Sequence, residues 1–574
     1  MTQLPRDGTP ILEGSNVASY LSFFALVWWV WASQVAYNVR FRRADWLHRL
    51  FVFLQVFVFC GLAAFTNDFN VVNGIVNSRD ELEANILERE ALMDDQIATP
   101  FLEGQQFRKD RLPTLNIRGI SMTMAFSRLL LLIQYTIAFY HAYTKDPSGE
   151  TRLSRYSSFL VHIGSLLFSS LCYFTAFGVI GTHPDEGDQI AKLVLWYLPL
   201  LTEVAAHFIS ISRLCNGWVR YRAELISTRS ATVFVIILGG GLDKITNGFQ
   251  FIIGNVSFGW QSLGLIFCAV MIFLLLFSLY FSTSEPEEHG NMRVIISFFF
   301  MFFYLSAIIV TLQGIAAMLQ AGNIGNALDI PLQFLRESKF IMELKGFGIH
   351  LNESDYIHSG IEKQLQKQGL ELSVLLPEIN YWIDNATMRN PPDFNLPYNA
   401  LLQTDEHFIE QVLFNLHSYP DDSLLLAKLD TFYYPLPDNY TLINNQTFND
   451  LVESIIIAHA TPALWFYASG GAVLVTLGLL GIIAQWPRDK YEWGQVLSRL
   501  LMGSAIILVS GLDVHASKNI VTEDFHYEGS RIWFLATHSL VLPPYAMALL
   551  IEQVIELILL HLAGHYLKPV TEPV

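Results

Sequence analysis

The chain has 574 residues, of which 52% are hydrophobic and only 15% are charged. Soluble domains carry about a quarter charged residues, so this composition indicates a chain that lies mostly in a lipid bilayer. The formal charge of −17 argues against nucleic-acid binding. The sequence also lacks the zinc, phosphate-loop and nucleophile-elbow motifs of common enzymes, and we expect neither an enzyme nor a bound cofactor or metal.

About eleven apolar segments, each of roughly twenty residues, are long enough to cross the hydrocarbon core. They are predicted near residues 17–37, 49–66, 119–143, 157–181, 190–211, 231–253, 259–282, 293–320, 461–486, 494–514 and 532–563. The sequence therefore predicts an all-α, polytopic transmembrane helical bundle. It divides into an N-terminal membrane domain (1–320) with about eight spans, a polar insert (321–460), and a C-terminal membrane segment (461–574) with about three spans.

Basic side chains mark every second short loop, as in the loops that contain Arg40, Lys145, Arg220 and Arg488, with one exception, the acidic loop at residues 285–288. Lys and Arg are retained on the cytoplasmic side of a membrane. This pattern places the N-terminus and the insert outside and the C-terminus in the cytoplasm. We expect an integral protein of the plasma membrane or of another membrane of the secretory pathway.

The insert contains four sequons for N-glycosylation, which is possible only on the luminal face. The acceptor residues are Asn352, Asn385, Asn439 and Asn445. The alternative is that sequons arose by chance in a cytosolic segment. The insert is acidic and shows apolar periodicity, which predicts amphipathic helices that form an extracytoplasmic helical domain.

Ionisable residues inside apolar spans are candidates for a transport path, because charge is costly there. Glu203 and His207 lie four residues apart, on one helical face, where they could share a proton. A buried structural pair is an equally good interpretation. Arg128 lies so deep in its span that it requires a carboxylate or carbonyl partner.

Three further acids complete the candidate path: Asp243, Asp513 and Glu552. Asp243 follows the glycines 239–241, which predict either an interrupted span of the kind that transporters use or a close approach of a neighbouring helix; the second is favoured. The span near 532–563 contains Pro543 and Pro544, which predict a kink.

A resemblance to a known family rests on two stretches. Asn16-Val-Ala-Ser-Tyr-Leu-Ser-Phe-Phe-Ala-Leu-Val-Trp-Trp-Val-Trp and Gly119-Ile-Ser-Met-Thr-Met-Ala-Phe-Ser-Arg-Leu-Leu130 are similar to the low temperature requirement A (LtrA) family, particularly its fungal members. The resemblance implies a preceding first span with a Glu-Leu-Phe-Phe-Asp-Leu type motif, without which this chain begins.

The family also carries a Glu-Arg-x-Gly motif that leads into Leu-Gly-Glu. Here Arg229 matches the motif, and Gly240 stands where the second acid would be. If the family's activity depends on that acid, its role in this chain is lost or has moved to Glu203 or Asp243.

Two functions from different classes follow. The first is a secondary transporter or channel for ions or a small solute, and it predicts that Glu203→Gln abolishes flux in a folded protein. The second is a membrane receptor or scaffold that binds a partner through residues 321–460. The expected partners are the lipid bilayer and an ion or small solute, with a homo-oligomer left open.

Overall fold

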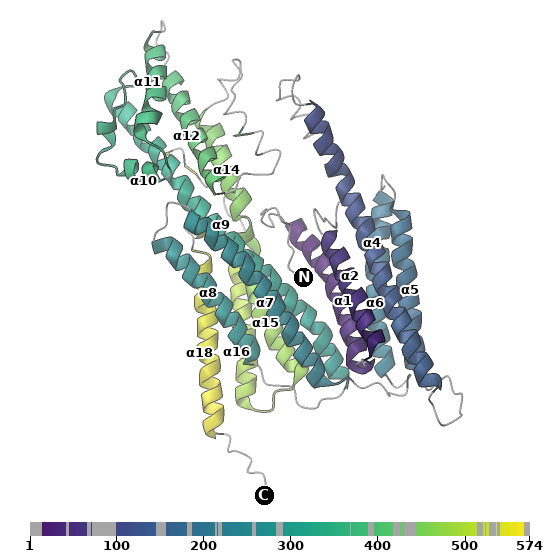
Figure 1. The fold of residues 1–574 in the computed structure, drawn as a ribbon. Helices are drawn as coiled ribbons and strands as arrows, with labels where there is room; N and C mark the ends of the chain where they lie inside the picture. Colours follow the sequence, from purple (N-terminus) through teal and green to yellow (C-terminus); the bar gives the residue numbers. More distant parts are fainter. Residues whose placement is uncertain are drawn as a thin grey trace.

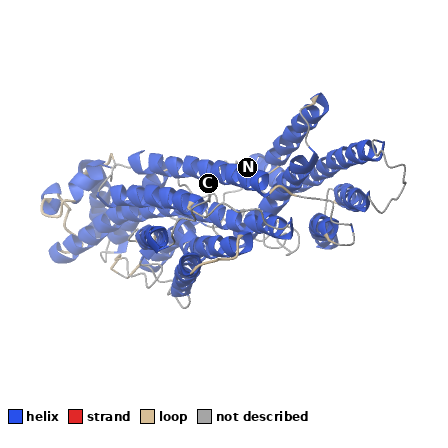
Figure 2. Ribbon diagram, turned by 90° about the horizontal axis from the view of Figure 1, so that it is seen from below, coloured by secondary structure: helices blue, strands red, loops and turns tan. Residues whose placement is uncertain are grey.

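The computed structural model is built of helices (Figure 2). It describes residues 14–41, 45–65, 71, 99–144, 156–180, 186–212, 215, 221–254, 260–282, 291–367, 369–388, 395–416, 425, 428–429, 444–513, 521–522, 524–526, 535–536 and 540–566. The helices of the membrane part are α1 Gly14–Phe41, α2 Trp46–Ala64, α4 Thr99–Thr144, α5 Ser157–Val179, α6 Glu186–Ile211, α7 Ala223–Gly254, α8 Trp260–Phe281, α9 Asn291–Lys345, α15 Pro462–Ala484, α16 Lys490–Val509 with the 3-10 turn η5 Ser510–Asp513, and α18 Leu542–Tyr566. The insert adds η3 Glu353–Tyr356, α10 Ile361–Lys367, α11 Leu372–Met388, α12 Asn395–Asn415 and α14 Asn445–Ala460.

The membrane helices form two groups that lie side by side (Figure 1). Helices α1, α2, α4, α5 and α6 lie together on the right of the view, and α7, α8, α9, α15, α16 and α18 lie on the left. Helix α1 lies at the boundary, because it contacts α4 in the first group and both α7 and α9 in the second. Polar side chains on α1 are therefore placed between the two groups.

Nine helices of the described part are long and apolar enough to cross a membrane. Helices α1 and α16 fall on two further predicted spans but carry more polar side chains, among them Gln34 in α1 and Arg499 in α16. The prediction of an all-α polytopic bundle is confirmed, and the protein is an integral membrane protein with several spans.

Helix α9 joins the membrane bundle to the insert without a break. Its 55 residues extend over about 80 Å at 1.5 Å per residue, far more than the ~30 Å hydrocarbon core. Helices α12 and α14 pack on its projecting half, where Leu335 and Met342 are fully buried. The predicted boundary at residues 320 and 321 lies inside this helix, and the insert lies at the opposite end of the molecule from the last turn of α18 (Figure 1).

The two prolines of the last span lie at the start of its helix, whereas the sequence predicted a kink within the span. Helix α18 begins at Leu542, so Pro543 and Pro544 lie in its first turn. A proline in the first turn removes an N–H that has no partner within the helix anyway. The predicted kink is therefore wrong: these prolines start the helix.

A buried acid lies in the insert, on α12. Asp405 is completely buried, and neither of its carboxylate oxygens has a hydrogen-bond partner among the described residues. Burial raises the pKa of Asp405 well above its usual range and outweighs the opposing effect of Arg336 on α9, while Glu406 adds to the rise. The native insert therefore holds this carboxyl group in its protonated form beyond the pH at which an unfolded chain would release the proton, about 3.9.

We expect Asp405→Asn to stabilise the insert at neutral pH. Between the unfolded and the folded pKa the native state holds a proton that the unfolded state has released, so the stability of the wild type falls as pH rises through that window. Asparagine keeps the size and removes the titration. Thermal unfolding from pH 4 to pH 8 should give similar melting temperatures for the two proteins at pH 4 and a higher one for the variant at neutral pH. A constant difference in melting temperature across this range would contradict the expectation.

Candidate functional site

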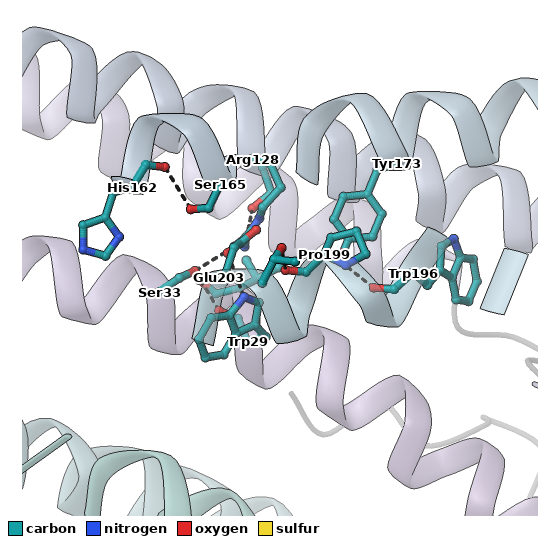
Figure 3. Close-up of polar contacts among 12 residues, drawn as sticks. Trp29, Ser33, Arg128, His162, Ser165, Tyr173, Trp196, Pro199 and Glu203 are labelled. Atoms are coloured by element: carbon teal, nitrogen blue, oxygen red, sulfur yellow. Dashed lines mark hydrogen bonds and ion pairs between the residues drawn. The ribbon is translucent and has the colours of Figure 1, made fainter. Parts of the chain in front are cut away.

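A buried ion pair lies among the helices of the right-hand group (Figure 3). Arg128 on α4 and Glu203 on α6 bring Nη1 and Oε2 within 2.6 Å of each other, and both side chains are almost fully buried. The same carboxylate oxygen accepts a hydrogen bond from Trp29 Nε1 at 2.8 Å, and Arg128 Nη1 donates to Ser33 Oγ at 2.9 Å. Three helices thus meet at one centre whose two charges cancel.

Each partner of this pair keeps one further polar atom. Glu203 Oε1 and Arg128 Nε are buried and form no hydrogen bond with another described residue. A buried polar group without a partner costs about 1–3 kcal/mol. Glu203 Oε1 is therefore free to accept a proton or a hydrogen bond, and Arg128 Nε–H is free to donate one to a water molecule or a solute.

The helix that carries the acid contains a proline one turn earlier, Pro199. Proline has no N–H for the carbonyl of the residue four positions before it, here Leu195. The Pro199 carbonyl accepts a hydrogen bond from Thr202 Oγ1 at 2.7 Å. The hydrogen-bond ladder of α6 is thus weakest next to Glu203, in a segment where α6 can bend.

A second polar cluster begins one turn beyond Glu203, at His207. His207 Nδ1 lies 2.8 Å from the hydroxyl of Tyr221, which also accepts a hydrogen bond from Arg40 Nη1 at 2.9 Å. Arg40 Nη1 also lies 3.3 Å from His162 Nε2, and its Nη2 donates to Ser158 Oγ at 3.4 Å. Two buried imidazoles and a buried phenol therefore meet the half-buried side chain of Arg40 at the end of α1.

The two clusters are adjacent. The rings of His162 and His207 have centroids 4.6 Å apart, and the ring of His207 meets that of Trp29 edge-on at 6.0 Å. From Trp29 to Arg40, α1 rises about 16 Å, which is about half of a hydrocarbon core. Polar groups therefore line α1 from the ion pair to the end of the helix.

The sequence identified Arg128, Glu203 and His207 as candidate members of this site but not their pairing. The expected partner of Arg128 is confirmed as a carboxylate, that of Glu203. Glu203 and His207 lie on one face as predicted, yet the carboxylate pairs with Arg128 and the imidazole with Tyr221. Their role in transport stays a prediction.

Asp243 lies apart from this site. Its side chain is exposed on α7, which runs unbroken through the glycines 239–241. A Cβ atom at Gly241 would lie 2.4 Å from Leu312 Cδ1 of α9. The glycines therefore permit a close approach of two helices, which was the favoured interpretation, and an interrupted span at this position is wrong.

Glu552 belongs to another buried cluster, in the left-hand group. It accepts a hydrogen bond from Ser498 Oγ at 2.6 Å, and one turn further along α18 Glu556 pairs with Arg499 at 2.5 Å. The side chain of Asp513 lies outside the described residues. Of the five path candidates whose side chains the structure describes, Arg128, Glu203 and His207 lie together, and Asp243 and Glu552 lie apart from them.

The predicted glycosylation acceptors have different environments. Asn352 is exposed ahead of η3, whereas Asn385 is half-buried within α11. Asn445 is half-buried and accepts a hydrogen bond from Tyr398. Asn439 lies outside the described residues. Asn352 is the most accessible acceptor of the three, and glycosylation stays a prediction.

Six members of the two polar clusters were not predicted from the sequence: Trp29, Ser33, Arg40, Ser158, His162 and Tyr221. Trp29 is one of several neighbouring tryptophans. The sequence does not show which of them donates its indole N–H to a carboxylate and which only packs in the core. Arg40 was recognised only as a basic loop residue. No cluster of three or more His, Cys, Asp or Glu side chains that could hold a metal ion occurs in the part of the chain that the structure describes.

Comparison with known proteins gives one finding. The family model described as "Bacterial low temperature requirement A protein (LtrA)" matches residues 3–329, which include the first eight predicted spans and both polar clusters. No curated protein and no solved structure matches the chain.

Proposed function

The chain belongs to the low temperature requirement A (LtrA) family, and from this premise we propose that it is a secondary transporter or channel for ions or a small solute. The observation that carries the proposal is the buried polar line from the Arg128–Glu203 pair to Arg40. Ionisable groups inside spans are expensive and usually line the path of an ion or a proton.

The chemistry of the line favours protons as a transported or coupling ion. A carboxylate and two imidazoles can each take up and release a proton, and the hydroxyl of Tyr221 can relay one between His207 and the end of α1. Protonation of Glu203 would remove the charge that holds Arg128 and loosen the contact among α1, α4 and α6. Proton uptake would thus be linked to a rearrangement of three helices, as coupled transport requires.

The test is flux into proteoliposomes that hold the purified chain, a pH-sensitive dye and an imposed pH gradient. The double variant Arg128→Met/Glu203→Gln removes the carboxylate without leaving a lone buried charge, and His207→Gln removes the adjacent imidazole while keeping the pair. We expect both to reduce the flux to the rate of empty liposomes. The matched control is His141→Gln, at an exposed imidazole near the end of α4.

Wild-type flux in both folded variants would contradict the proposed path. Absence of flux in the wild type, with protons and several other cations, would contradict the transport function. Folding of each variant is checked by thermal unfolding, so that a loss of flux is not mistaken for a loss of protein.

The continuity of α9 favours a second candidate, a receptor or scaffold. One helix runs from the membrane bundle into residues 321–460, so a partner bound to the insert would act directly on the bundle. We propose that the insert lies outside the cell or in the lumen of the secretory pathway and that the C-terminus lies in the cytoplasm, following the basic loops. This candidate predicts that antibody fragments against the insert block function while His207→Gln does not.

A further inference from the structure

A groove of about 810 Å³ opens between α1, α2 and the start of α7. It is separate from the buried polar line, whose residues do not line it. One end of the groove lies where α1 ends and α2 and α7 begin, and the other reaches back to the middle of α1 and α2. Its two ends differ in chemistry.

The mouth of the groove is basic. His48 and Arg49 in the first turn of α2, Arg222 just before α7, and Arg229 in its second turn all line it, and no acid is among the lining residues. The three arginines are exposed and form no ion pair with a described residue. Asp45 caps the amino end of α2 and lies 2.5 Å from His48 Nδ1, so the positive charge of the mouth comes from the three arginines. This end of the groove is thus suited to an anion with more than one negative charge.

The depth of the groove is mostly apolar, apart from Gln34, whose side-chain N–H donates to Gln134 Oε1 at 3.0 Å. Trp31 and Val35 of α1 and Val52 and Phe59 of α2 line it below the arginines. Asn38, one turn before the end of α1, stands at the transition between the two parts. The change from basic to apolar occurs along the axis of membrane-crossing helices, as the change from headgroup to acyl chain does in a lipid.

We propose that this groove binds an anionic phospholipid, with its phosphorylated headgroup on Arg49, Arg222 and Arg229 and an acyl chain against Trp31 and Phe59. Arginine forms paired, charge-assisted hydrogen bonds with phosphate oxygens. Basic pockets between spanning helices are the kind of site that binds phosphorylated lipid headgroups. The groove lies at the contact between the two groups of helices, so a bound lipid would bridge α1, α2 and α7.

The first arm of the test measures binding of a fluorescent phosphatidylinositol bisphosphate to the purified full chain in detergent micelles. Arg222→Gln/Arg229→Gln should weaken binding by about 10- to 30-fold, from about 1 kcal/mol for each basic residue near phosphate. The matched control is Arg293→Gln/Lys490→Gln, which removes two exposed cations that begin α9 and α16. Equal weakening by both pairs would overturn the site, because binding would then follow net charge alone.

The second arm separates a lipid from a free phosphate compound. Val52 is 41% exposed in the apolar depth, so Val52→Trp should fill the groove without disturbing the core. We expect it to weaken binding of the lipid at least tenfold and to leave binding of soluble inositol bisphosphate unchanged. If the soluble compound binds as tightly as the lipid and Val52→Trp changes neither, the groove is a phosphate site and the lipid proposal fails. It also fails if the bisphosphate lipid binds no better than phosphatidylcholine.

Discussion

Replacing Glu203 with glutamine is expected to lower the free energy of unfolding by about 3–5 kcal/mol, because it leaves the buried Arg128 guanidinium without a counter-charge. The double variant Arg128→Met/Glu203→Gln should lose much less, since no net charge then remains inside the bundle. Arg128→Met alone should fall between the two, because the orphaned carboxyl group can take up a proton, whereas a guanidinium cannot release one. The ranking of the three variants by lost free energy of unfolding therefore tests whether the two buried charges stabilise each other.

Thermal unfolding in lipid nanodiscs at pH 7 gives the ranking. An exposed acid at the start of α7, Glu224, supplies the control, since Glu224→Gln removes one carboxylate that is in contact with solvent. Loss in the double variant as large as in Glu203→Gln would contradict the expectation and would assign the stability to Trp29 and Ser33 rather than to charge.

The sequence predicted the spans because apolar length alone determines which segments cross a bilayer. It also identified Arg128 and Glu203, since a charge within an apolar run is conspicuous. Their pairing could not be predicted: they are 75 residues apart on helices that are not consecutive, and the packing of both helices on α5 places them together. Tyr221 was missed for the same reason, because it precedes α7 as an ordinary loop residue and gains a role only from the position of His207.

A repeated tetrapeptide shows what the sequence can and cannot predict about a buried arginine. Ser-Arg-Leu-Leu occurs at Ser127 and again at Ser498, and in each case the arginine is buried and pairs with a glutamate of another helix, Arg128 with Glu203 and Arg499 with Glu556. A buried arginine in a span requires a carboxylate, so the pattern predicts that a partner exists. It does not predict which acid, since Glu552, the neighbour of Glu556 on α18, accepts from Ser498 instead.

Gly471 on α15 is expected to be the most sensitive small residue of the left-hand group. A Cβ atom there would lie 2.5 Å from the carbonyl oxygen of Gly503 and 2.8 Å from the backbone nitrogen of Ile507, both on α16. A flexible side chain could move away, but a helix backbone cannot, so Gly471→Ala must push the two helices apart. Overpacking of this kind costs about 1–3 kcal/mol, and we expect the upper end because backbone atoms are struck.

The same helix offers the control, Gly481→Ala, whose added methyl group would meet nothing closer than Val496 Cγ2 at 4.0 Å. Gly503→Ala should be as harmful as Gly471→Ala, since its Cβ would lie 2.7 Å from the Gly471 carbonyl oxygen. The two changes relieve each other: once the helices have separated for one methyl group, the second fits, so the double variant should lose less than the sum of the single losses. Additive losses, or a Gly471→Ala variant as stable as Gly481→Ala in nanodiscs, would show that α15 and α16 do not cross at these glycines.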